Sequence, residues 1–273
     1  MKLALNGATT MKADLETDVR AAHSGGFDGL EIWASKLKTF LKSHTTDALT
    51  RLLKEQDIQP FSINSIERIT FRDSDQRKAL IAECDSLCRI ASDIGCPYIV
   101  VVPSPLPPGV TESEVMKESI GVLSELARVA EQYQIRLAFE FIGQPDSSVQ
   151  TLAQAHRIVE GVGLASVGLV LDSFHFYAGG STLESILELD ANRLFIFHIN
   201  DAEDLPRDKL EDRHRLLPGL GILPLKEIGV ALSRIGYDGI ASVEIFRPEY
   251  WERDPLTLAE QARIATQLVL ATT

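Results

Sequence analysis

Four residues that can bind a metal ion stand inside short apolar runs in the second half of the chain. They lie in the runs LAFEF, GLVLD, FIFHI and ASVEI, and are Glu140, Asp172, His198 and Glu244. Three carboxylates and one imidazole suit a single divalent ion, and these ligand types alone do not choose among Mn²⁺, Zn²⁺, Co²⁺ and Mg²⁺. The sequence therefore predicts one divalent-metal site formed by these four residues.

The charge of these runs leads to the same prediction. A structural ion pair can explain a single buried carboxylate, but these runs bring three carboxylates and contain no Lys or Arg. Because burial of even one unpaired ion costs several kcal/mol, a bound cation is needed to compensate them. Each residue alone is more commonly a cap or a loop partner at a strand end, and only the set of four favours a metal.

The four runs belong to a regular alternation of β-type and helical patterns along the whole chain. The helical segments carry apolar residues at helical spacing, and several end at a glycine just before the next strand. The predicted strands are 2–7, 29–33, 60–64, 98–102, 136–141, 167–172, 194–200 and 241–246. The predicted helices are 15–23, 46–56, 75–94, 112–132, 152–162, 182–189, 225–235 and 258–269.

Strands that alternate with helices predict an α/β fold with a parallel sheet, and this number of units predicts a single (β/α)₈ TIM barrel. We expect one domain over residues 1–273, because about 250 residues is typical of such a barrel. The turn NGATT after the first strand has no glycine-rich phosphate-binding pattern, so a dinucleotide-binding open sheet is not indicated. In a TIM barrel the active site lies at the C-terminal ends of the strands, where the four residues fall.

The chain order of the four ligands predicts how they surround the ion. Neighbouring strands are about 4.8 Å apart, so ligands from the two outer strands must reach further than those from the two inner strands. The outer positions carry the long side chains of Glu140 and Glu244, and the inner positions carry Asp172 and His198. We expect the two glutamates to flank the ion from opposite sides and to act as an acid–base pair toward a bound substrate.

The composition argues against several classes of partner. Lys plus Arg total 27 and Asp plus Glu total 39, and the formal net charge of −12 disfavours nucleic acid and anionic membranes. No apolar run reaches the roughly 18 residues of a membrane helix, and the N-terminus lacks a signal-peptide pattern. The chain has an odd number of cysteines in one helical region, Cys84, Cys88 and Cys96, and this favours reduced thiols over disulfides. We therefore expect a cytoplasmic protein. The sequence does not indicate its oligomeric state.

Several motifs of the chain resemble the xylose-isomerase-like TIM-barrel family of sugar isomerases and epimerases. Within it the resemblance is strongest to the enzymes of inositol catabolism that isomerise 2-keto-myo-inositol, an inosose. The most specific pieces are DSFH at residues 172–175 and FRPEY at residues 246–250, and the resemblance extends over essentially the whole chain. The loop at residues 218–221 departs from it, because it reads PGLG where the family often has PGQG.

The resemblance implies roles for particular residues. That family's metal ligands fall on the four residues above, and we assign Glu140 and Glu244 a second role as the acid–base pair. The ion would polarise the carbonyl of a small polyhydroxy ketone and stabilise an enediolate while the glutamates move a proton. We expect the substrate contacts to come from four further polar residues, which are His175, Arg215, Arg247 and Asn6.

Three other functions stay open at this point. The same family contains 3-dehydroshikimate dehydratases, and cations that could hold a substrate carboxylate, such as Arg215 and Arg247, keep that lyase activity as the main alternative. A phosphodiesterase of endonuclease IV type needs a His-rich multinuclear site and a basic surface, which six His and the net charge argue against. A non-catalytic sugar-binding barrel is least favoured, because two glutamates flank one ion.

Overall fold

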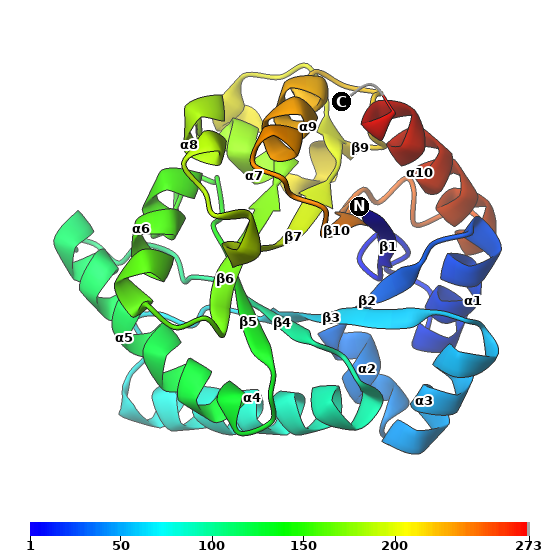
Figure 1. Ribbon diagram of the computed structural model, residues 1–273, viewed down its shortest axis with the longest axis horizontal. Coiled ribbons are helices and arrows are strands. Elements are labelled where there is room, and N and C mark those ends of the chain that lie inside the picture. The colour runs from blue at the N-terminus through cyan, green and yellow to red at the C-terminus, as the bar shows by residue number, and fades with distance from the viewer. Residues whose placement is uncertain (272–273) are drawn as a thin grey trace.

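Parallel strands form a closed barrel at the centre of the computed structural model, which describes residues 1–271 (Figure 1). Each strand pairs with its neighbours in chain order, and the last strand pairs with the first. The predicted TIM barrel is confirmed. Its strands are β1 (Lys2–Asn6), β2 (Gly29–Trp33), β3 (Gln59–Ile66), β4 (Tyr98–Val101), β5 (Arg136–Glu140), β6 (Val167–Asp172), β7 (Leu194–Ile199) and β10 (Ile240–Val243).

The helices form a ring outside the strands, and α10 packs beside α1 to close this ring (Figure 1). None of the helices in residues 1–271 is long and apolar enough to cross a membrane. The helices are α1 (Leu15–Gly25), α2 (Ala34–Phe40), α3 (Thr46–Glu55), α4 (Ser74–Ile94), α5 (Glu112–Glu131), α6 (Leu152–Val162), α7 (Ser173–Ala178), α8 (Leu183–Leu187), α9 (Leu225–Arg234) and α10 (Pro255–Leu270). The loops add the 3₁₀ helices η1 (Ala191–Arg193), η2 (Arg207–Lys209) and η3 (Asp212–His214), and a two-stranded sheet of β8 (Asp201–Ala202) and β9 (Arg215–Leu216).

Capping residues set the helix boundaries. Thr111 and Thr151 start α5 and α6 with capping boxes, in which the cap and the third helical residue bond to each other's backbone N–H. Gly26, Gly95 and Gly163 end α1, α4 and α6 with φ of 75°, 73° and 68°, a left-handed conformation in which glycine has no Cβ clash. The predicted helix ends at glycines are therefore confirmed for these three helices.

Two helices and the small sheet are missing from the predicted elements. The helices α2 and α7 have only 7 and 6 residues, which is too short for an apolar period to be recognised. The sequence predicts a loop at His175, but in the structure this residue lies in α7. The last barrel strand β10 ends at Val243, so Glu244 follows the strand instead of lying within it.

The barrel interior changes from apolar to polar along its axis. Apolar side chains that include Ala4, Val100, Ala138 and Val170 form one buried cluster. Polar side chains at later strand positions, or just after a strand, are also buried, and they are Asn6, Glu31, Ser62, Asn64, Glu140, Asp172, His198, Ser242 and Glu244. The strands therefore carry a group of charges to their C-terminal ends, where TIM barrels place their active sites.

Candidate metal centre

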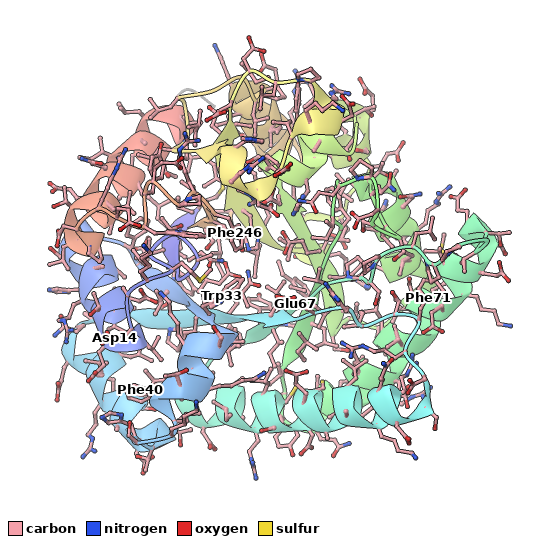
Figure 2. All side chains as sticks on the ribbon, turned by 180° about the vertical axis from the view of Figure 1, so that it is seen from behind. Asp14, Trp33, Phe40, Glu67, Phe71 and Phe246 are labelled. Atoms are coloured by element: carbon pink, nitrogen blue, oxygen red, sulfur yellow. The ribbon has the colours of Figure 1, made fainter. Side chains whose placement is uncertain are left out.

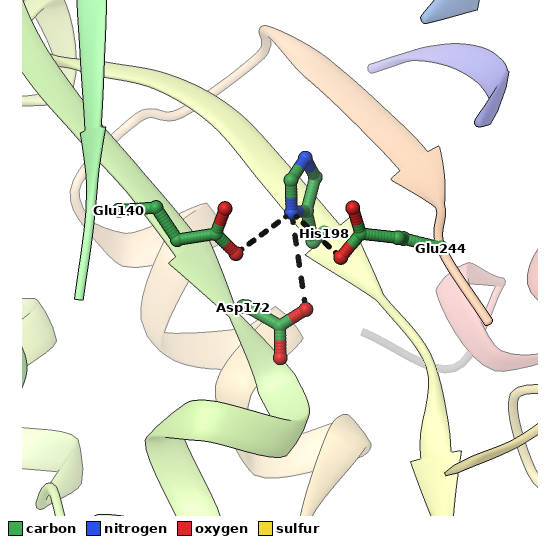
Figure 3. A group of neighbouring side chains, drawn as sticks. All are labelled: Glu140, Asp172, His198 and Glu244. Atoms are coloured by element: carbon green, nitrogen blue, oxygen red, sulfur yellow. Dashed lines mark hydrogen bonds and ion pairs between the residues drawn. The ribbon is translucent and has the colours of Figure 1, made fainter. Parts of the chain in front are cut away.

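The four predicted metal ligands meet at the C-terminal end of the barrel. Glu140 and Asp172 are the last residues of β5 and β6, His198 lies in β7, and Glu244 follows β10. Each residue offers one ligand atom, and these atoms lie within 4.8 Å of one another. All four side chains point toward a common centre (Figure 3). A donor set of three carboxylates and one imidazole at this spacing fits a single divalent ion.

The Nδ1 atom of His198 faces all three carboxylates. It lies 3.0 Å from Glu140 Oε1, 3.3 Å from Glu244 Oε2 and 3.8 Å from Asp172 Oδ2, as the dashed lines in Figure 3 mark. The ring and the three carboxylates are buried. Burial alone would lower the pKa of His198, but Glu244, Glu31 and Glu140 outweigh it and raise that pKa well above its ordinary value. The surrounding carboxylates therefore favour a positive charge at the position of this ring.

Arg215 brings one cation to the site from outside the barrel strands. Its Nη1 lies 2.7 Å from Asp172 Oδ2 and 3.1 Å from Glu244 Oε2, and its Nη2 lies 3.0 Å from Asp212 Oδ1. Arg215 belongs to β9, so this cation lies outside the four sequence runs that carry the predicted ligands. Burial alone would raise the pKa of Asp172, but Arg215, His175 and His198 outweigh it and lower that pKa to about 2.

The two glutamates are held differently. Oε1 of Glu244 accepts hydrogen bonds from Asn6 Nδ2 at 3.1 Å and from Asn64 Nδ2 at 2.8 Å, and its Oε2 faces Arg215. Glu140 lies beside His198, and burial together with the negative charges of Glu244 and Asp172 raises the pKa of Glu140 to about 8. A proton can therefore reside on Glu140 near neutral pH, whereas Glu244 is fixed by several N–H donors.

A cavity of about 390 Å³ opens next to the four ligands. Glu140 and Glu244 line it together with polar side chains such as His175 and Arg215, and this volume is in the range of small-molecule sites. Trp33 and Phe246 also line it, with ring centroids 5.5 Å apart in an edge-on arrangement. Both rings lie over the barrel opening in the view from behind (Figure 2).

His175 presents an unused donor among the cavity-lining side chains. Arg215 Nη2 lies 3.1 Å from His175 Nε2, and because a guanidinium only donates, Nε2 must be the acceptor. The imidazole proton is then on Nδ1, which is buried and has no hydrogen-bond partner within residues 1–271. Leaving a buried donor unpaired costs about 1–3 kcal/mol, so this N–H is suited to bind an oxygen of a ligand.

Two other predicted substrate contacts lie outside the cavity lining. Asn6 is buried at the end of β1, where its amide contacts Glu244. Arg247 pairs with Glu203 at 2.7 Å and with Glu249 at 3.3 Å. Direct contact of Asn6 and Arg247 with substrate stays a prediction, and in the structure Asn6 contacts the predicted metal ligand Glu244.

Glu31 is one buried acid of the site that is not among the predicted residues. It lies in β2, and its Oε2 is 3.0 Å from Nε2 of His198. Its run GLEIW has the same apolar-flanked carboxylate as the runs that carry the predicted ligands. However, this run lies in the first half of the chain, away from the consecutive strands that carry the predicted ligands.

Comparisons with known proteins agree with this geometry. A family profile described as "Xylose isomerase-like TIM barrel" matches residues 19–267. An inosose isomerase of Bacillus velezensis is 37% identical over 99% of this chain and 98% of its own length. One from Halalkalibacterium halodurans is 38% identical over 92% of this chain and 90% of its own length. A crystal structure of the IolI protein with a bound zinc atom superposes with a TM-score of 0.96, at 37% identity, over 99% of this chain and 98% of that chain.

Proposed function

Because this chain belongs to the xylose isomerase-like TIM-barrel family, we propose that it is a metal-dependent isomerase of an inosose, 2-keto-myo-inositol. The observation that carries this proposal is the convergence of Glu140, Asp172, His198 and Glu244 beside a cavity of about 390 Å³. Similarity to inosose isomerases over nearly the full chain supports the choice of substrate.

We propose that the same four residues hold one divalent ion, with Zn²⁺, Mn²⁺, Co²⁺ and Mg²⁺ as the candidates. A divalent ion in such a site supplies Lewis-acid chemistry that makes a carbon next to a ketone more acidic. The site buries three carboxylates beside His198, and Arg215 is the nearby guanidinium. The carboxylates therefore leave an excess of negative charge, which such an ion offsets.

Glu140 and Glu244 carry out the proton transfer in this proposal. They stand on opposite sides of His198, so one can remove the proton next to the ketone while the other returns a proton at the neighbouring carbon (Figure 3). The pKa of Glu140, raised to about 8 by burial, lets this residue hold or release a proton near neutral pH. Asn6 and Asn64 fix the direction of Glu244 through its other oxygen.

His175 and Arg215 orient the substrate in this proposal. The buried Nδ1–H of His175 donates to a substrate hydroxyl, and Arg215 keeps the proton on that nitrogen by donating to Nε2. Trp33 and Phe246 give the cavity an apolar wall suited to the C–H faces of a ring.

The charges of the cavity favour a neutral polyhydroxy ketone over 3-dehydroshikimate. A substrate carboxylate needs an available cation, but Arg215 already lies within 3.1 Å of three carboxylates. Arg247 is paired with two glutamates and does not line the cavity. Among the described lining residues Arg68 is the other cation, so the dehydratase remains the second candidate.

The same proposal includes the partners, the cellular compartment and the domain organisation of the enzyme. The substrate is a small molecule, and neither nucleic acid nor a membrane is a partner. We place the enzyme in the cytoplasm, where thiols stay reduced, because Cys84, Cys88 and Cys96 are free. We treat residues 1–273 as one domain.

Proton NMR tests the proposed reaction directly. Zinc-loaded protein is incubated with 2-keto-myo-inositol in D₂O, with a parallel Mn²⁺-loaded sample assayed for turnover. We expect a new inosose isomer, and solvent deuterium at the carbon that receives the proton would establish proton transfer. An unchanged substrate with both metals contradicts the proposal, and conversion of 3-dehydroshikimate in its place would assign the dehydratase.

A further inference from the structure

A carboxylate that lies deeper in the barrel contacts the other face of the proposed metal-binding histidine. Glu31 stands in the middle of β2, with its side chain fully buried in the barrel interior. Its Oε2 and Oε1 lie 3.0 Å and 3.2 Å from His198 Nε2. Strand β2 is not adjacent to β7 in the barrel, so this contact crosses the interior.

The two nitrogens of His198 thus serve two separate groups. Nδ1 faces Glu140, Asp172 and Glu244, whereas Nε2 faces Glu31 alone among the acids of the described chain. A neutral imidazole has one N–H donor and one lone pair, and a metal requires the lone pair. If Nδ1 binds the ion, the proton must be on Nε2, where Glu31 accepts it.

His198 is the one ion-pair partner of the buried Glu31 among the described residues, and the hydroxyl groups of Ser62 and Ser242 also lie beside this carboxylate. The salt bridges of the described residues pair Glu31 with His198, and with no Lys or Arg. Because an isolated buried carboxylate costs several kcal/mol, it is retained only where positive charge compensates it. A divalent ion held by Nδ1 of His198 would add to that positive charge through the ring.

We propose that Glu31 is a positioning residue for the metal, which fixes the Nε2–H tautomer of His198 and strengthens Nδ1 as a ligand. Histidine ligands commonly donate their second N–H to a carboxylate in this way, and loss of that partner typically weakens metal binding about 10–100-fold. The inference rests on the metal site of the proposed function, but it does not depend on which substrate is converted.

Two substitutions separate the hydrogen bond from the charge. Glu31→Gln keeps an oxygen acceptor at the same side-chain length without the charge, and Glu31→Met keeps a similar length with only a weakly accepting sulfur. Val100→Ala is the control, because Val100 is a buried interior residue of the apolar cluster and truncating it perturbs packing alone. The measurements are the Zn²⁺ dissociation constant, by competition with a chromogenic chelator, and the ¹⁵N and ¹H NMR signals of the His198 ring.

We expect zinc binding to weaken about tenfold in Glu31→Gln and about 100-fold in Glu31→Met, with Val100→Ala unchanged. In the zinc-loaded wild type, Nε2 carries the proton and Nδ1 binds the metal, and the Nε2–H signal moves upfield in Glu31→Met. Wild-type affinity in both Glu31 variants, or an Nε2-bound metal, overturns the inference. Absence of zinc binding by the wild type overturns it together with the metal site, whereas failure to isomerise inosose leaves it intact.

Discussion

The two halves of the barrel contribute different groups to one site. Strands β5, β6 and β7 and the residue after β10 provide the four proposed metal ligands. Strands β1, β2 and β3 provide Asn6, Glu31 and Asn64, which contact those ligands and are not among them. The second half therefore supplies the proposed metal ligands, and the first half contacts two of them, His198 and Glu244.

This division follows from barrel closure. Because β1 pairs with β10, Asn6 at the end of β1 stands next to Glu244. Glu31 reaches the same site from inside the barrel, through its contact with His198. Residues that contact a proposed metal ligand can thus come from strands far away in sequence, as long as their side chains reach the same height along the barrel axis.

The largest effect is expected from the acid–base pair of the second half. Replacing a glutamate by glutamine keeps the side-chain length but removes its ability to carry a proton. In Glu140→Gln and Glu244→Gln we expect kcat for inosose isomerisation to fall by about 10²–10⁴-fold. Circular dichroism and the Tm serve as controls for folding. If either variant retains near-wild-type turnover, that residue is not part of the acid–base pair.

Zinc affinity is expected to rise with pH. The metal needs an ionised Glu140 and a neutral Nδ1 on His198, but burial raises the pKa of Glu140 to about 8 and the surrounding carboxylates raise that of His198. Below these pKa values zinc must displace protons, so affinity should increase by about tenfold per pH unit for each proton released. The check is competition titration between about pH 6 and pH 8.

The variant Glu140→Gln is the matched control for this pH dependence. It removes one of the two titrating groups, so the logarithm of its zinc affinity should change less steeply with pH than that of the wild type. A pH-independent affinity of the wild-type protein would contradict the proposed ligand set.

A smaller effect is expected from the amides of the first half. Asn6 and Asn64 donate to the same oxygen of Glu244, and a hydrogen bond to a charged group is worth about 1.5–3 kcal/mol. We expect Asn64→Ala to lower kcat about tenfold or more, and Asn6→Ala to do so to a similar extent. The double variant should lose less than the product of the two effects, because both amides act on one atom. A loss of kcat in the double variant equal to the product of the two single losses would show that the two amides act independently.

The smallest effect is expected at Arg247. It lies outside the cavity and is paired with Glu203 and Glu249, so its loss should remove only two partly exposed ion pairs. For Arg247→Ala we expect kcat and KM within about threefold of the wild type. A large rise in KM alone would restore the substrate contact that the sequence predicts for this residue.

The fold and the ligand cluster could be predicted because each left a local signal. The alternation of β-type and helical runs determines the barrel, and Asp172 or Glu140 stands out as a charge at the end of an apolar strand. Barrel geometry then brings such strand ends together, so no long-range information was needed.

The supporting groups could not be predicted in the same way, because their partners are set by three-dimensional contacts. Nothing in the run GLEIW indicates that Glu31 faces a histidine 167 positions away. Arg215 lies in β9, a strand of two residues, and His175 lies in a helix of 6 residues, so neither element shows a period. The pairing of Arg215 with three carboxylates depends on how the loop after β7 folds over the barrel.

We propose that the second half of the barrel binds one divalent ion and that the first half fixes two of its ligands, His198 and Glu244. Anomalous diffraction at the zinc edge from a zinc-loaded crystal tests it most directly. We predict a single peak among Glu140, Asp172, His198 and Glu244, about 2.0–2.1 Å from Nδ1 of His198. Glu31 should remain within hydrogen-bond distance of Nε2. A zinc peak elsewhere, or zinc bound to Nε2 of His198, would contradict this arrangement of ligands.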